Sequence, residues 1–184
     1  MALESKIGEF ISELRRLRDA FEALSLTIVE DRPAKGAAVL LDQMGDAILA
    51  LMGLLDECLL HARAAEGAVG SQVDFHAARR ALGRCQNQVH QIEAQFVSEL
   101  ASYERLKDLA CLGKERRGEW RAWAGSTRDG VERCREPLQA LSQALARCWE
   151  EMAEHAGSNA VSVHTISIGK KVVNRGVETS QERM

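Results

Sequence analysis

Metal binding is the first chemistry that the residue types suggest, because the chain contains five cysteines and five histidines. Cys58 and His61 come closest to a pair of metal ligands, since they lie about one helical turn apart. No two histidines have the HxxxH or HExxH spacing, and two ligands do not complete a zinc site. The alternative is a core cysteine beside a surface histidine, and the sequence predicts neither a metal nor another cofactor.

Nucleophilic and acid–base catalysis require a reactive side chain beside a group that activates it. The sequence contains no GxSxG elbow and no glycine-rich phosphate loop. Its paired carboxylates, such as Asp56-Glu57 and Glu150-Glu151, are adjacent in sequence and therefore point in different directions on a helix. The ExxH pattern of carboxylate metal sites in helical bundles is also absent. We therefore expect a protein without enzymatic activity, unless a site is assembled from distant helices.

Two tryptophans three residues apart, Trp120 and Trp123, lie beside Arg117 and Arg121. Aromatic and basic side chains together can stack on nucleic acid or lie at a membrane interface. The alternative is that the indole rings anchor one end of a core and the arginine stems pack over them. The formal net charge of -3 argues against a general nucleic-acid binder, which normally carries a basic excess.

The stretch from Leu40 to Leu60 is apolar on more than one face of a helix. Such a helix is either buried in the centre of a bundle or meets a partner or membrane. The carboxylates around it, such as Asp42 and Asp46, count against direct attraction to an anionic bilayer. The residues of this candidate membrane-binding or partner-binding helix are Ile48, Leu51, Met52 and Leu55.

The segment from residue 161 to residue 173 is rich in β-branched residues that alternate with polar ones, and it contains no proline. This pattern predicts a strand or a small hairpin that turns at Gly169-Lys170. A lone hairpin is marginal in water, so the strand needs a partner, by edge addition or by cross-β stacking. The alternatives are a disordered end and a strand that packs on the helices. The candidate partner-binding residues are Val161, Val163, Ile166, Ile168, Gly169, Val172, Val173 and Asn174.

The run Val163-His164-Thr165-Ile166-Ser167-Ile168-Gly169 resembles the amyloid signalling motifs of the RIP homotypic interaction type. These motifs centre on an apolar-polar-apolar-glycine unit, which here is Ile166-Ser167-Ile168-Gly169, with an asparagine downstream. Ser167 replaces the usual glutamine, and Asn174 lies further from the glycine than in the motif. In bacteria and fungi such tails follow a helical cell-death domain of the HeLo or Bell type. The resemblance implies bacterial innate immunity or regulated cell death, with membrane disruption by the helical domain as the output.

The elements that carry these residues are predicted from apolar positions that recur three and four residues apart. This spacing predicts helices over residues 3–29, 33–65, 73–112 and 119–155, with loops at 67–71 and 113–118. Four long helices with short connections pack most simply as an antiparallel bundle. The predicted fold class is all-α, with a helical domain over residues 1–156 and a β-prone interaction tail over residues 157–184.

Composition and cysteine usage indicate the compartment. The cysteines are odd in number, form no CxxC pair and lie in helical patterns, as expected for small core residues in a reducing environment. The N-terminal residues lack a basic segment followed by an apolar run, and no stretch is apolar enough to span a bilayer. A cytoplasmic location is therefore expected.

Three functions remain open at this stage. The leading hypothesis is a non-enzymatic effector or adaptor that recruits a protein partner through its tail, self-assembles there and contacts membranes on activation. The first alternative is a helical scaffold subunit whose tail adds one strand to the sheet of a partner. The second alternative is a nucleic-acid-binding accessory bundle that uses the tryptophan and arginine cluster.

Overall fold

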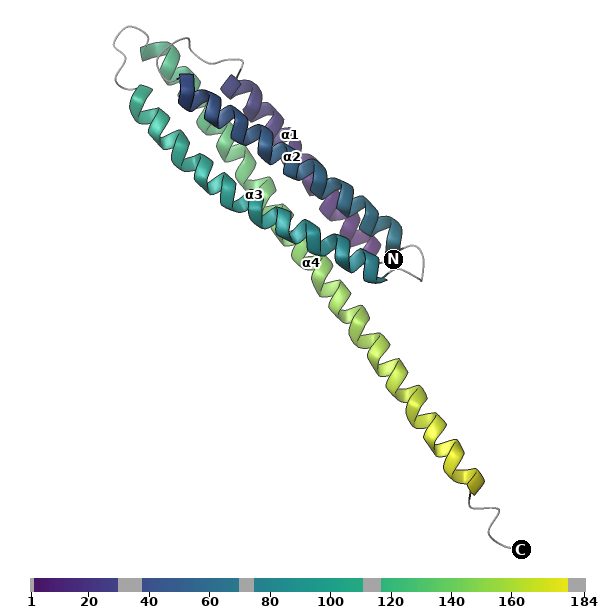
Figure 1. Cartoon of the computed structure of the whole chain (residues 1–184). Helices are drawn as coiled ribbons and strands as arrows, with labels where there is room; N and C mark the ends of the chain where they lie inside the picture. The colour runs from purple at the N-terminus through teal and green to yellow at the C-terminus, as the bar shows by residue number, and fades with distance from the viewer. Residues whose placement is uncertain (1, 30–37, 70–74, 111–116, 179–184) are drawn as a thin grey trace, which may run out of the picture. The chain divides into compact units, whose positions relative to one another are not determined.

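The structure is a computed structural model that describes the backbone of residues 2–29, 38–69, 75–110 and 117–178. These residues form four helices: α1 (Ala2–Val29), α2 (Ala38–Val69), α3 (Phe75–Ala110) and α4 (Arg117–Glu178) (Figure 1). No strand occurs in these ranges, and the predicted all-α class is confirmed.

The chain divides into two compact units, Met1–Cys148 and Trp149–Met184. The sequence pattern predicts this boundary at residue 156. We call the described residues up to Cys148 the four-helix unit. Within it, α1, α2, α3 and the first part of α4 lie side by side (Figure 1).

Helix α1 runs antiparallel to both of its neighbours. On α4, Trp123 Nε1 donates a hydrogen bond of 3.0 Å to the carbonyl oxygen of Thr27, near the end of α1. Further along α4, Glu136 Oε1 accepts a 3.1 Å hydrogen bond from Arg16, which lies earlier in α1. Residue numbers therefore rise along α4 as the numbers of their hydrogen-bond partners fall along α1, which makes the two helices antiparallel. On α2, Asp56 accepts a bond of 2.8 Å from Arg18 Nε.

Helix α3 is antiparallel to α2 and to α4 in the same way. Between α2 and α3, Gln88 Nε2 donates a 2.8 Å hydrogen bond to Glu57. Between α3 and α4, Tyr103 donates a 2.9 Å hydrogen bond to the carbonyl oxygen of Ala124, and Ser142 donates one to Glu93. These contacts set the register that places side chains from distant parts of the sequence together.

The core of the four-helix unit consists of the apolar stripes that the helical periodicity predicts. On α1, apolar residues that recur three and four positions apart are buried, which places one side of that helix in the core. These buried residues are Ile7, Phe10, Ile11, Leu14, Leu17, Phe21, Leu24 and Ile28. Burial of such stripes is the main source of stability in an all-helical unit.

Two glycines allow α1 to approach its neighbours closely. A Cβ atom added to Gly130 on α4 would lie 2.9 Å from Leu24 Cδ1, and one added to Gly45 on α2 would lie 2.9 Å from Val29 Cγ2. Atoms this close would have to move apart. The absence of a side chain at these positions therefore helps to set the spacing between the helices.

Thr127 is fully buried, and its hydroxyl has no hydrogen-bond partner among the described residues. Removing this unpaired group by Thr127→Val is expected to raise the free energy of unfolding by about 1 kcal/mol. Chemical denaturation measures the change. The matched control is Thr27→Val, because the Thr27 hydroxyl donates to the carbonyl oxygen of Ala23 at 3.1 Å. Equal effects of the two substitutions would contradict the prediction.

Helix α4 differs from its prediction at the C-terminal end. It was expected to end near His155 and to be followed by a strand over residues 161–173, but the backbone is helical to Glu178. Extending an existing helix satisfies one backbone hydrogen bond per added residue, whereas a lone strand leaves its backbone groups without partners. The expected loop at 67–71 is helical to Val69. The rest of that loop and residues 111–116 lie outside the described residues.

Candidate functional site

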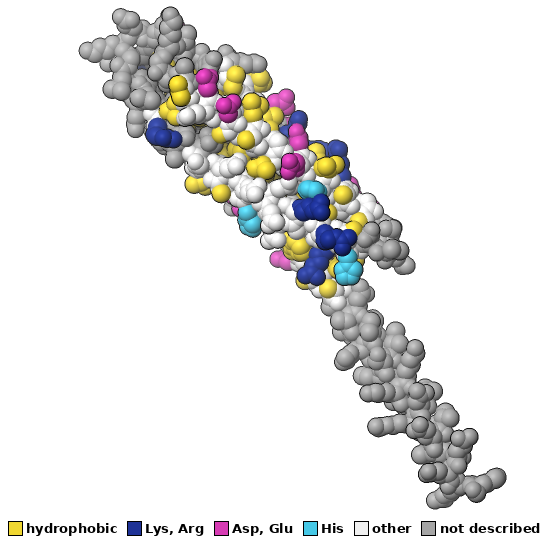
Figure 2. Space-filling model, viewed as in Figure 1, with side chains coloured by type: hydrophobic (Ala, Val, Ile, Leu, Met, Phe, Trp, Pro, Cys, Tyr) yellow, Lys and Arg dark blue, Asp and Glu magenta, His cyan; other side chains and the backbone are white. Residues whose placement is uncertain are grey.

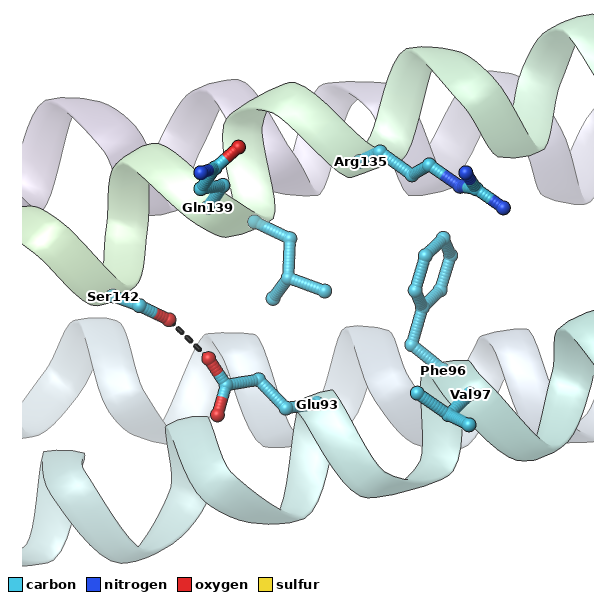
Figure 3. A pocket seen from close by; sticks show the side chains of 7 residues that line it. Glu93, Phe96, Val97, Arg135, Gln139 and Ser142 are labelled. Carbon is cyan, nitrogen blue, oxygen red and sulfur yellow. Dashed lines mark hydrogen bonds between the residues drawn. The ribbon is translucent and has the colours of Figure 1, made fainter.

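A groove of about 340 Å³ lies between α3 and α4 in the four-helix unit (Figure 3). Its walls are mostly apolar, and polar side chains border the two ends. Phe96 is buried at its base while Val97 on the rim is 66% exposed. The lining residues are Glu93, Phe96, Val97, Arg135, Leu138, Gln139 and Ser142.

Two polar residues that line one end of this groove are hydrogen-bonded to each other: the Ser142 hydroxyl donates to Glu93 Oε1 (Figure 3). His90 is not among the lining residues, and its Nδ1 lies 3.4 Å from Glu93 Oε2. The carboxylate therefore lies between the histidine and the hydroxyl. In a nucleophilic triad the histidine contacts the hydroxyl and takes its proton. Here the Glu93 carboxylate contacts both groups instead, so it fixes the position of the Ser142 hydroxyl and links α3 to α4.

Cys58 packs against Cys85 of α3. Its sulfur lies 4.0 Å from the carbonyl oxygen of Cys85, and the sulfur of Cys85 lies 3.5 Å from the carbonyl oxygen of Cys58. Two causes raise the pKa of the Cys58 thiol: the larger is a hydrogen bond with the Cys85 thiol, and the smaller is burial. Both thiols are fully buried. In the part of the chain that the structure describes, no three potential metal ligands gather in one place.

The four described cysteines are free and buried: Cys58, Cys85, Cys134 and Cys148. Burial raises the pKa of Cys134 to about 12 and that of Cys148 to about 12. Neutral buried thiols of this kind are poor nucleophiles, because the thiolate is the reactive form.

The two tryptophans of the predicted stacking surface lie in the core. Trp120 is 8% exposed and Trp123 is 5% exposed. Their rings meet edge to face at 5.7 Å, and Trp123 is held by its hydrogen bond to α1. The indole faces are therefore not open for stacking on bases. Arg121 is exposed, and the side chain of Arg117 lies outside the described residues.

The residues proposed for a membrane-binding or partner-binding helix belong to α2. Ile48, Leu51 and Leu55 are buried in the core, and Met52 is partly exposed. The structure thus uses these side chains for packing within the four-helix unit. No helix in the described ranges combines the length and the apolar content that crossing a membrane requires.

The candidate partner-binding residues at the C-terminal end all lie in the last part of α4. Their backbone is helical, and the side chains of Val161, Val163, Ile166, Ile168, Gly169, Val172, Val173 and Asn174 lie outside the described residues.

No sequence motif marks Glu93, Ser142 and His90 as a set. Glu93 and His90 are one helical turn apart, which is a weak signal for an ion pair. Ser142 is 49 residues away from Glu93, and only the register of α3 against α4 brings them together.

Comparison with known proteins adds no further assignment. No protein-family model matches the chain, and no significant match was found among curated proteins or solved structures.

Proposed function

We propose that the chain is a non-enzymatic interaction protein in bacterial defence signalling or regulated cell death. In this proposal the four-helix unit is the effector or adaptor domain, and residues 161–174 recruit a protein partner by strand pairing. The signalling role follows from the resemblance of Ile166-Ser167-Ile168-Gly169 to amyloid signalling motifs. Membrane contact through α2 would require the unit to open, because Ile48 and Leu51 are in its core.

The observation that carries the proposal is the division of the chain. The four-helix unit has its own core, and the β-branched run lies in the other unit, Trp149–Met184. Valine, isoleucine and threonine are poor helix formers, and Gly169 and Gly176 each cost about 1 kcal/mol in a helix relative to alanine. A partner strand that supplies backbone hydrogen bonds would favour conversion of this stretch from helix to strand.

Replacing both Ile166 and Ile168 by lysine tests this function. The two residues share one face of a strand, the face expected to pack into the dry interface between sheets, so cross-β stacking would bury like charges there at every repeat of about 4.8 Å. We expect assembly and partner-dependent activity to be lost, while thermal unfolding of the four-helix unit stays unchanged. On the full chain, sedimentation measures assembly and circular dichroism measures thermal unfolding.

The control is Thr165→Lys with Ser167→Lys, which adds the same charge to the opposite face of the strand. Assembly that persists in this control and fails in the Ile166 and Ile168 variant supports strand pairing. Earlier melting of the Ile166 and Ile168 variant would mean that the segment is part of the domain's own structure. Recruitment through this segment would then be abandoned.

A second candidate function is a helical scaffold subunit that binds its partner through a helix instead of the added strand expected from the sequence, and the continuation of α4 to Glu178 favours this mode. In that case residues 157–178 bind the partner as a helix. A complex that forms at fixed stoichiometry without fibrils and without gaining strand signal would support the scaffold function over amyloid signalling.

A further inference from the structure

The solvent-facing side of helix α2 is more apolar than that of the other helices. Three large apolar side chains on it are exposed: Val39 (73%), Leu49 (55%) and Leu60 (67%). The mean hydropathy of α2 is also the highest of the four helices. Exposed apolar residues gathered on one element are more informative than scattered ones.

Several of the exposed positions of α2 form one line along the helix. Steps of three, four and seven residues connect them, so they lie on one side, opposite the buried Ile48 and Leu55. We call this line, together with the exposed Arg63 at its edge, the outer face of α2. Its residues are Asp42, Asp46, Leu49, Gly53, Asp56, Leu60, Arg63 and Ala64.

The outer face of α2 is complementary to the same face of a second, antiparallel copy. Asp46 and Leu49 are three residues apart, and Leu60 and Arg63 are also three residues apart. If two copies of α2 pair antiparallel, Leu49 of one copy faces Leu60 of the other. The same register places Asp46 opposite Arg63. A two-fold axis repeats each contact, as an isologous interface requires.

The charged groups of this pattern are available for such a contact. Asp46 and Arg63 are exposed, and no ion pair is formed by either of them within the described residues. Asp56 lies on the same face, opposite Gly53 of the second copy in this register, and its carboxylate is already paired with Arg18 of α1.

The surroundings extend the same charge pattern. On the face of α2 and α3 in Figure 2, carboxylates lie mainly over the upper half, and arginine and histidine side chains lie over the lower end. The lower end contains the first turns of α3, where Arg79, Arg80 and Arg84 are exposed. Antiparallel pairing brings the acidic end of one copy to the basic end of the other.

Gly53 lies near the middle of the pattern and makes close approach feasible. A Cβ atom added there would meet no atom within 4 Å, unlike one at Gly45 or Gly130. The packing of the chain itself therefore does not require glycine at this position. A glycine in the interior of an exposed helix costs about 1 kcal/mol relative to alanine, and at a helix–helix contact it lets a second backbone come close.

We propose that the outer face of α2 is the interface of a homodimer in which the α2 helices of two copies pack antiparallel. Leu49 packs on Leu60 of the second copy, and Asp46 pairs with its Arg63. This surface belongs to the four-helix unit and does not depend on residues 157–184.

Charge exchange in the full chain tests the dimer by sedimentation velocity over a range of concentrations. Asp46→Arg places two positive charges opposite each other at positions 46 and 63, and Arg63→Asp places two negative charges there. The two-fold axis repeats each repulsive contact, so it occurs twice in the dimer. Each substitution is expected to weaken dimerisation about tenfold or more. The double variant Asp46→Arg with Arg63→Asp restores opposite charges and is expected to recover most of the affinity. Asp19→Arg on α1 is the control for net charge, and it should leave the dimer unchanged.

A steric variant provides an independent measurement. Gly53→Gln adds a side chain where the chain itself leaves open space, so the fold should be as stable as the parent or more stable while dimerisation weakens. Gly125→Gln on α4, where a Cβ also meets nothing within 4 Å, is the control. Repeating the measurements with lysine at positions 166 and 168 separates the dimer from assembly through the C-terminal segment. A monomeric parent chain at the highest concentration reached, or a dimer that no charge variant weakens, would overturn the proposal.

Discussion

Phe21→Ala is expected to lower the free energy of unfolding by about 3–5 kcal/mol, the largest effect of any single core substitution proposed for this chain. Phe21 is fully buried on α1, and its ring lies 5.9 Å from the ring of Phe96 on α3. Truncation removes the buried ring and leaves a cavity between the two helices. Urea denaturation followed by circular dichroism measures the loss.

The matched control is Leu26→Ala on the same helix, because Leu26 is 48% exposed. Its effect should stay within about 0.5 kcal/mol, as is usual for surface substitutions. A small effect at Phe21, comparable with that at Leu26, would mean that α1 does not pack in the core as described.

Alkaline pH is expected to destabilise the fold through its buried thiols. In the folded chain burial holds the pKa of Cys134 and of Cys148 at about 12, above the ordinary value of 9.0. Between these values the unfolded chain has lost protons that the folded chain retains. The stabilisation is therefore fully present below pH 9 and is lost as the pH rises toward 12. Each thiol contributes a fall of about 1.4 kcal/mol per pH unit in this window.

Denaturation of the reduced protein at several pH values between about 8 and 10.5 measures this slope. Cys134→Ala removes one thiol and should make the decline shallower by the contribution of one group, whatever its effect on stability at neutral pH. An unchanged slope in this variant would show that other groups cause the alkaline destabilisation.

The stripe on α1 shows what helical periodicity can predict. Every apolar residue assigned to it is buried, from Ile7 to Ile28. Charged residues occupy the other side, so only one orientation of the helix buries apolar surface. The long helix α3 was predictable for the same reason, and its residues from Ala78 to Phe96 are buried at the expected spacing.

The orientation of α2 could not be predicted in this way. Its sequence is apolar on more than one side, so periodicity alone did not separate the buried Ile48 and Leu51 from the exposed Leu49 and Leu60. The separation depends on which residues meet α1 and α3, and the register of the helices decides it. The same register joins Glu93 to Ser142 and Cys58 to Cys85.

The helical backbone of residues 161–173 was not predicted either, because the prediction rested on local composition. β-branched residues favour strands when cross-strand neighbours pack against them. The described residues contain no strand that could supply such neighbours, and α4 already supplies a helix to extend. Propensity was therefore outweighed by backbone hydrogen bonding along the existing helix.

The contacts of α1 also determine the order in which the four-helix unit can close. Arg16 and Glu136 are 120 residues apart, and Thr27 and Trp123 are 96 apart, whereas the contacts between α2 and α3 span only about 30 residues. Hairpins of neighbouring helices therefore form first, since short loops cost less entropy to close. During synthesis one flank of α1 stays uncovered until α4 leaves the ribosome. During this interval the exposed apolar surface of α1 is most prone to aggregation, and a chaperone would bind it then.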